Sequence, residues 1–241
     1  MISNIQRWLF LWSSIVALAV AANAQLRDPD PKEKEVLAKY RTVVNEILDQ
    51  FRSDDWDETV DYEVGDDVSV APNADRPLDV NEMFQRSYNL RPGSQRYTSK
   101  ILPSLQKLQE TQNISEKQKL GKEIQKFMHL RVEVHFNVAN VGDIEPPPSQ
   151  NTDLKIAGAA FAYKTKNNVT NADSAAAILA FGNWQPVKWD AEHGWYHFHF
   201  VHLVNTPYIE NVVVNLYGAS DRIDELLHSI DWKRVNDALT R

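Results

Sequence analysis

The sequence contains no cysteine, and its 8 glycines are scattered along 241 residues. The lack of cysteine excludes disulfide bonds, thiolate catalysis and cysteine-bound metal. The lack of a glycine cluster excludes the glycine-rich loops that bind phosphate groups. The Gly-x-Ser-x-Gly turn of serine nucleophiles is also missing. These absences favour a protein without catalytic activity.

Residues 1–24 have the pattern of a signal peptide. Arg7 supplies a positive charge, an apolar stretch runs from Trp8 to Ala21, and Ala22-Asn23-Ala24 matches a cleavage site. The apolar stretch is too short to span a membrane comfortably. We therefore expect a chain that is exported to the periplasm or the extracellular space, with no stable membrane anchor after cleavage.

The charge of the chain narrows the classes of partner. The formal net charge is −7 at pH 7, which argues against nucleic acid and against anionic membrane surfaces. We expect the partner to be a protein, a peptide or a small molecule. The sequence does not identify it further.

Hydrophobic periodicity predicts an α+β fold. We expect a mainly helical region with an acidic loop over residues 25–128, and an α+β sheet domain ending in a C-terminal helix over residues 129–241, packed as one compact unit. The sheet is expected to be mostly antiparallel, with about five strands and helices on one face. The acidic loop, Ser53 to Asp67, lacks the ligand spacing of a calcium loop and is interpreted as a solvated turn with an edge hairpin.

Several helices follow from local patterns. Apolar residues recur at intervals of three and four from about Lys32 to Phe51, which predicts an amphipathic helix. Asp79 with Glu82 forms a capping pair that predicts a short helix through Tyr88. Further helices are expected from about Gln95 to Thr111, with Pro103 moving the start towards Leu102, from Ser115 through Phe127, and over Asp173 to Ala180.

The strands centre on one predicted hairpin. The segment from Trp195 to Leu203 is almost entirely aromatic, β-branched or histidine, and a turn at Pro207 leads into Tyr208 to Tyr217. We expect these two segments to pair, with Phe198, Phe200, Val212, Val214 and Leu216 facing the core. Strands are also expected over Leu130 to Ala139 and over Leu154 to Lys164.

The polar face of the sheet is the first candidate site. Alternation along the strands predicts one side that carries donors and acceptors, with an aromatic rim formed by Trp189, Trp195 and Tyr217. The candidate ligand-binding residues are Arg131, Glu133, His135, Asn137, Asn211 and Asn215. An ordinary solvated face of an antiparallel sheet has the same pattern.

The histidines are the second candidate site. His197 and His199 share a strand face at a separation of about 7 Å, and a third ligand from His135 or His193 would complete a zinc or copper site. The run His197-Phe198-His199 resembles the zinc strand of the α-type carbonic anhydrases, but no other part of that family's pattern is present. Imidazoles on an aromatic-rich strand are also ordinary surface residues.

Three functions are consistent with these patterns. The first is a non-catalytic binding or interaction module. The second is a metal-binding protein or a metal-dependent hydrolase or lyase that uses the His-x-His strand. The third is a structural partner that docks to another chain through the N-terminal amphipathic helix.

Overall fold

A computed structural model describes residues 28–62, 82–138, 151–165, 177–185, 188–192, 195–197, 200, 209–237 and 239. The predicted signal peptide lies outside these residues. Among the helices of the described part, none combines the length and apolarity that a membrane span requires.

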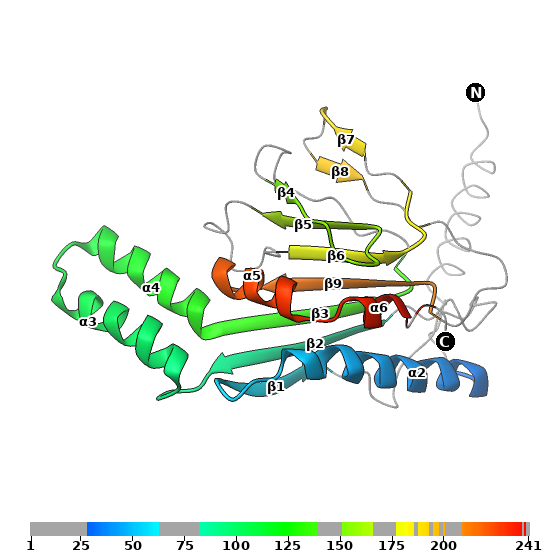
Figure 1. Cartoon of the computed structure of the whole chain (residues 1–241), viewed down its shortest axis with the longest axis horizontal. Helices are drawn as coiled ribbons and strands as arrows, with labels where there is room; N and C mark the ends of the chain where they lie inside the picture. Colours follow the sequence, from blue (N-terminus) through cyan, green and yellow to red (C-terminus); the bar gives the residue numbers. More distant parts are fainter. Residues whose placement is uncertain are drawn as a thin grey trace, which may run out of the picture.

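The fold is α+β, as expected, and its sheet has seven strands in the order β1-β2-β3-β9-β6-β5-β4 (Figure 1). Every neighbouring pair is antiparallel. A separate two-stranded sheet is formed by β7 and β8. The strands are β1 Trp56–Tyr62, β2 Glu82–Leu90, β3 His129–Phe136, β4 Asn151–Asp153, β5 Phe161–Thr165, β6 Ala177–Gly182, β7 Lys188–Asp190, β8 Trp195–His197 and β9 Asn211–Tyr217.

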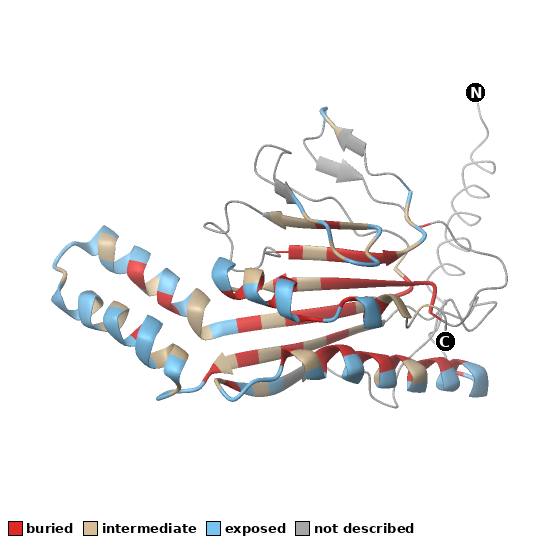
Figure 2. Cartoon of the chain, in the orientation of Figure 1, coloured by how far each residue is buried: buried red, intermediate tan, exposed pale blue. Residues whose placement is uncertain are grey.

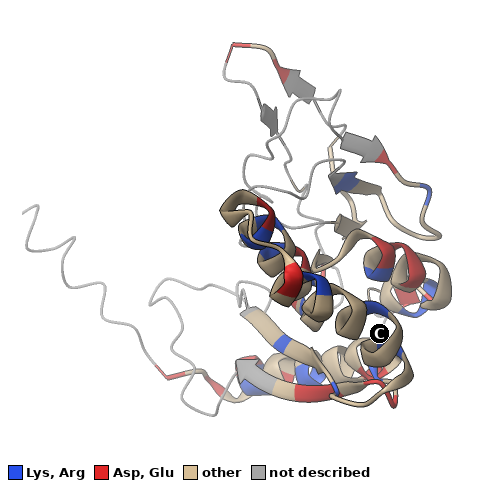
Figure 3. Cartoon of the chain, turned by 90° about the vertical axis from the view of Figure 1, so that its left-hand side faces the viewer, with Lys and Arg blue, Asp and Glu red and all other residues tan. Residues whose placement is uncertain are grey.

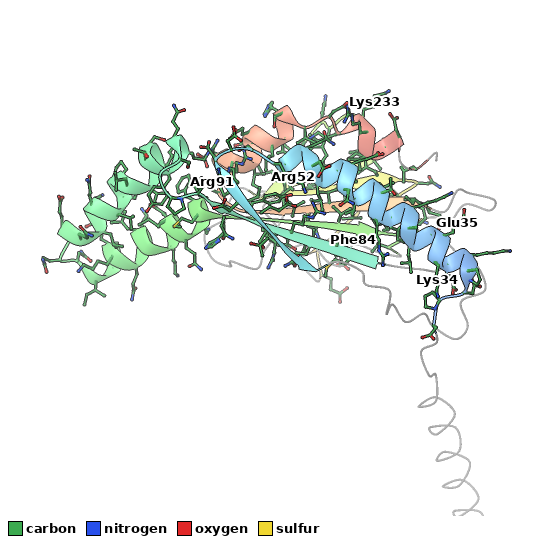
Figure 4. All side chains as sticks on the ribbon, turned by 90° about the horizontal axis from the view of Figure 1, so that it is seen from below. Lys34, Glu35, Arg52, Phe84, Arg91 and Lys233 are labelled. Carbon is green, nitrogen blue, oxygen red and sulfur yellow. The ribbon has the colours of Figure 1, made fainter. Side chains whose placement is uncertain are left out.

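Helices α2, α5 and α6 lie over one face of the large sheet (Figures 1 and 4). Their bounds are α2 Pro31–Leu48, α5 Ser220–Ser229 and α6 Lys233–Asp237, and the 3-10 helix η1, Asp49–Phe51, continues α2. The Asp30 side chain accepts hydrogen bonds from the first turn of α2, and the Glu33 side chain accepts one from the Asp30 backbone. This capping box confirms the predicted N-terminal helix.

The core lies between these helices and the sheet (Figure 2). Tyr40 of α2 stacks on Phe136 of β3 with 4.6 Å between ring centroids. Val212, Val214 and Leu216 are each 0% exposed, which confirms the predicted core face of this strand. The apolar stripe of α2 is therefore buried within its own chain.

A helical arm projects beyond the sheet between β2 and β3 (Figure 1). The arm, residues 96–128, contains the π-helix η3 (Tyr97–Ile101), α3 (Leu102–Glu110) and α4 (Ile114–Met128). The helical turns already begin at Gln95, as the apolar pattern predicted, and run through η3 into α3, so Pro103 does not move the start to Leu102. Asn113 caps α4 by accepting hydrogen bonds from the backbone N–H groups of Ser115 and Glu116, so the cap lies earlier than expected.

The predicted hairpin between Trp195–Leu203 and Tyr208–Tyr217 is wrong. Both sides of β9 are occupied, by β3 and by β6, and β8 pairs with β7 instead. Val212, Val213 and Val214 are all buried, so the middle of β9 is apolar on both faces. A strand of this kind is typical of the centre of a sheet rather than of a terminal hairpin.

Residues 82–90 form a strand rather than the predicted helix. Phe84, Arg86, Tyr88 and Leu90 are buried in alternation along it. The burial of Arg86 hides this two-residue period in the sequence. Because β1 and β2 pair with each other and β2 pairs with β3, the region that was expected to be mainly helical contributes two strands to the sheet.

Two further elements differ from expectation. Residues 177–182 form β6 rather than the end of an alanine-rich helix, and its alanines fit a crowded position between β5 and β9. The strand expected from Leu154 is confined to Phe161–Thr165.

Candidate functional site

The face of the sheet opposite the helices carries a polar cluster. Val132 and Val134 are 0% exposed and point into the core, so the alternate residues of β3 point to the other face. These are Arg131, Glu133 and His135, and β9 adds Asn215 and Tyr217 beside them. We call these five residues the Glu133 cluster. The structure thus brings together four of the six predicted ligand-binding residues.

The Glu133 carboxylate is the centre of the cluster. The Tyr217 hydroxyl donates a hydrogen bond to its Oε2 at 2.9 Å, and the Asn215 amide nitrogen lies 3.4 Å from the same oxygen. The His135 Nε2 lies 3.4 Å from Oε2, and the Arg131 Nε lies 3.4 Å from Oε1. A carboxylate with only 9% of its residue exposed is therefore surrounded by donors on two strands.

These contacts decide the charge of Glu133. Burial acts to raise its pKa, but hydrogen bonds from His135, Tyr217 and Asn215 and the positive charge of Arg131 outweigh burial, so the pKa lies below its ordinary value. Burial, together with the charge and hydrogen bond of Glu133, raises the pKa of Tyr217 to about 12. The cluster accordingly contains a fixed carboxylate and a fixed phenol at neutral pH.

Part of the cluster faces solvent. The Arg131 guanidinium lies 4.0 Å from the centroid of the Tyr217 ring, in a cation–π contact. The side chains of Arg131 and His135 are 31% and 25% exposed. The buried Oδ1 of Asn215 has no hydrogen-bond partner within the described part of the chain. A ligand at this face can therefore meet one cation and one imidazole.

The face changes from polar to apolar across the sheet. In the strand register, one row of paired residues runs through Gln85, Glu133, Asn215, Ile178 and Tyr163. At about 4.8 Å per strand, Glu133 and Tyr163 lie about 14 Å apart along the row. The floor of the candidate site is thus a polar patch next to an apolar one.

Aromatic side chains border the apolar end. Trp184 packs edge-on against Phe161 at 5.6 Å and against Phe200 at 5.5 Å between ring centroids. Trp184 and Phe200 also form an isolated backbone bridge. The predicted rim residue Tyr217 belongs to the Glu133 cluster itself, whereas the side chains of Trp189 and Trp195 lie outside the described residues.

Asn137 does not belong to this face, contrary to the prediction, and Asn211 is too deeply buried at the edge of the face to meet a ligand. Asn137 has a φ of 51°, which turns its side chain to the core side, where it donates to the Tyr40 hydroxyl and accepts from the Glu210 N–H. Asn211 is 0% exposed and exchanges two hydrogen bonds with the backbone of Val138. Both amides satisfy the backbone where β3 ends and β9 begins.

The predicted metal site falls largely outside the described residues. His193 and His199 lie outside them, and for His197 only the backbone is described, in β8 opposite Lys188. His135 lies in the Glu133 cluster. Where side chains are described, no group of three histidine or acidic residues is arranged to hold a metal ion.

A polar cavity of about 370 Å³ lies at the base of the arm. Its charged residues pair across the seam between the arm and α5: Arg96 with Glu225, and Lys100 with Asp221 at 3.8 Å. The charges within each pair neutralise each other. We therefore interpret the cavity as part of the contact that holds the arm against α5. It is lined by Asp55, Gln95, Arg96, Ser99, Lys100, Asp221 and Glu225.

Comparison with known proteins adds no family assignment. No family model matches the sequence, and neither the curated proteins nor the solved structures contain a significant match. The function is therefore inferred from the residues of this chain.

Sequence reasoning missed the neighbours that complete the face. Gln85 and Ser87 lie on β2, opposite Glu133 and Arg131, and were hidden by the helix prediction for that segment. Ile178 was likewise assigned to a helix. The alternation of Phe84, Arg86 and Tyr88 was the signal that could have placed β2 in the sheet.

Proposed function

We propose that the chain is an exported, soluble, non-catalytic binding protein, whose ligand binds at the Glu133 cluster on the face of the sheet opposite α2, α5 and α6. The export signal over residues 1–24 supports the location. The absence of a Gly-x-Ser-x-Gly turn and of a glycine-rich phosphate loop supports the lack of catalysis. The partner is a peptide, a small molecule or an exposed segment of another protein.

The observation that carries this proposal is the buried charge of Glu133 on a face that the described helices do not cover. Removing a carboxylate from water costs several kcal/mol unless its partners compensate for the loss. The hydrophobic core lies on the other face of the sheet and does not need this charge. A network of five polar side chains in such a position orients donors and acceptors, which is the usual role of the few polar groups in a binding site.

The pKa values favour binding over proton transfer. A general acid or base works best when its pKa lies near the working pH. The pKa of Glu133 is shifted downward, away from neutrality, and that of Tyr217 is shifted upward to about 12. Both groups thus keep one protonation state near pH 7, which suits a fixed recognition surface.

The geometry also indicates the character of the ligand. Arg131 and His135 offer a partly exposed cation and an imidazole to a ligand. Ile178 and Tyr163 continue the same row with apolar surface. We therefore expect an amphipathic ligand, with its anionic or polar group over Arg131 and its apolar part over Tyr163.

A thermal-shift screen tests the proposal. The chain without its signal peptide would be screened against amphipathic carboxylic acids and short peptides, because a ligand at a hundred times its Kd stabilises the native state by about 2.7 kcal/mol. The double variant Arg131→Ala, Asn215→Ala should lose the stabilisation. The control Lys34→Ala, Glu35→Ala, on the exposed side of α2 (Figure 4), should retain it. Equal stabilisation of all three proteins, or of none, would contradict the proposal.

A further inference from the structure

The helical arm has a charge opposite to that of the rest of the chain. Residues 96–128 contain seven lysines and arginines and three glutamates, a formal charge of +4 in a chain of −7, which leaves −11 elsewhere. Figure 3 views the molecule from the side of the arm, with lysine and arginine in blue. Because the arm projects beyond the sheet and the screening length is about 8 Å at physiological ionic strength, its outer part is screened from most of the acidic body.

The positive charge is concentrated on one side of α4. Leu120 and Ile124 are 8% and 7% exposed and pack towards the protein. By the helical period, the opposite side of α4 presents a face that has no carboxylate and no apolar side chain. It consists of Ser115, Gln118, Lys119, Lys122, Gln125 and Lys126. We call its three lysines the lysine stripe.

The charge of the stripe is poorly compensated within the protein. Lys119 lies 4.0 Å from Glu123, but both side chains are at least half exposed, so solvent screens this pair. Lys122 and Lys126 have no carboxylate within ion-pair distance among the residues that the structure describes. Partial burial and the neighbouring charge of Lys122 lower the pKa of Lys126. A bound anion would relieve this repulsion.

We propose that the lysine stripe binds an anionic polysaccharide, a linear polymer with carboxylate or sulfate groups. The face from Ser115 to Lys126 is about 17 Å long at 1.5 Å per residue, and α4 is a single straight element, so consecutive sugar units can follow it. Lysines attract the anionic groups, and Gln118 and Gln125 provide amide groups for sugar hydroxyls.

The composition of the face disfavours two other occupants. The centre of a protein interface is enriched in aromatic residues and depleted in lysine, whereas this face has no aromatic or aliphatic side chain. Single-stranded nucleic acid is held by aromatic stacking platforms, which are equally absent here. Duplex nucleic acid is recognised mainly through its phosphates, and it is an explicit outcome of the test below.

The test is calorimetric titration of the full chain, without its signal peptide, with a size-defined heparin fragment at low salt. Each lysine near an anionic surface contributes about 1 kcal/mol, which is about fivefold in Kd. The triple variant Lys119→Gln, Lys122→Gln, Lys126→Gln should therefore weaken binding by roughly 100-fold. Circular dichroism checks that the variant, whose changes all lie on the outer side of α4, retains its helices.

The matched control removes the same charge elsewhere. Lys32→Gln, Lys34→Gln and Lys233→Gln alter exposed lysines on α2 and α6, of which Figure 4 labels Lys34 and Lys233. They should leave Kd within about twofold, because charges far from the stripe are screened. An equal loss in both triple variants would overturn the proposal, as would a wild-type protein that does not bind heparin. Equal affinity for duplex DNA of matched charge would overturn the assignment to polysaccharide. These outcomes do not depend on the Glu133 cluster.

Discussion

The hydroxyl of Tyr217 donates a hydrogen bond of 2.9 Å to the carboxylate of Glu133, although the two residues are not opposite each other in the sheet. In the register of β3 and β9, Tyr217 pairs with Arg131 and Glu133 pairs with Asn215. The diagonal between neighbouring strands is within reach of a long aromatic side chain. This contact links both residue pairs into one network. A substitution at Glu133 should therefore change the pKa of Tyr217.

The first prediction concerns the stability that Glu133 provides. Glu133→Gln should lower the free energy of unfolding by about 1–3 kcal/mol at pH 7, because the charged acceptor of several buried donors is lost. Urea denaturation of both proteins at pH 7 measures this difference. Glu35→Gln, which alters a side chain that is 55% exposed, should change stability by less than about 0.5 kcal/mol.

The same difference should depend on pH. The pKa of Glu133 is lower in the folded protein than its ordinary value of 4.5, so its contribution is complete above pH 4.5 and is lost as the pH falls through the lowered folded value. The stability gap between the wild type and Glu133→Gln should therefore narrow in acid. A gap that stays constant from pH 7 into strong acid would show that Glu133 is not held as an anion.

The second prediction concerns the phenol of Tyr217. The charge and hydrogen bond of Glu133 help to raise the Tyr217 pKa to about 12, after the larger effect of burial. In Glu133→Gln this pKa should fall, while burial keeps it above the ordinary value of 10.0. Carbon-13 NMR of the labelled tyrosine ring follows the titration. An unchanged Tyr217 pKa would mean that the two side chains are not in contact in solution.

The third prediction compares two arginines on the β1–β2 side of the sheet. Arg86 is 4% exposed, and its guanidinium bonds Glu58 and Asn45 at 2.6 Å each. Arg86→Ala should destabilise the protein by about 1–3 kcal/mol, because Asn45 and Glu58 lose a buried donor, while Glu58 keeps its pair with Arg52. Arg91→Ala breaks an exposed pair with Asp57 and should cost about 0–1 kcal/mol. Chemical denaturation measures both, and similar losses would contradict the assignment of the buried face.

The fourth prediction compares two glycines. Gly182 has a φ of +113°, and an added Cβ would lie 2.7 Å from the Glu210 carbonyl oxygen. Gly182→Ala should therefore destabilise the protein by about 1–3 kcal/mol. Gly121 lies within α4 with no atom near the added Cβ, so Gly121→Ala should stabilise by about 0.5–1 kcal/mol. Opposite signs of these two shifts in melting temperature are the expected result.

The sequence predicted the elements whose periods are uninterrupted. Helix α2 has a broad apolar stripe and a capping box, and β3 alternates without a break, so local pattern alone determines both. The segment 82–90 was mispredicted because Arg86 occupies a core position. Its burial is tolerable only through Glu58 and Asn45, which are distant in sequence. No local pattern contains that information.

The candidate site was predicted only in part for the same reason. Alternation along β3 placed Arg131, Glu133 and His135 on one face, and the structure agrees. Asn137 departs from that face because its positive φ reverses the alternation at the end of the strand. The neighbours on β2 and β6 depend on strand order, which arises from pairings across the whole chain rather than from local sequence.

The most direct test of the account is backbone NMR with the most stabilising compound from the thermal-shift screen. Titration of the isotopically labelled chain shows which amides change on binding. The account predicts the largest shifts at Arg131 to His135, at Asn215 and at Ile178, in one row across β3, β9 and β6. Shifts confined to α2, α5 or the helical arm would place the ligand on another surface and contradict the proposed site.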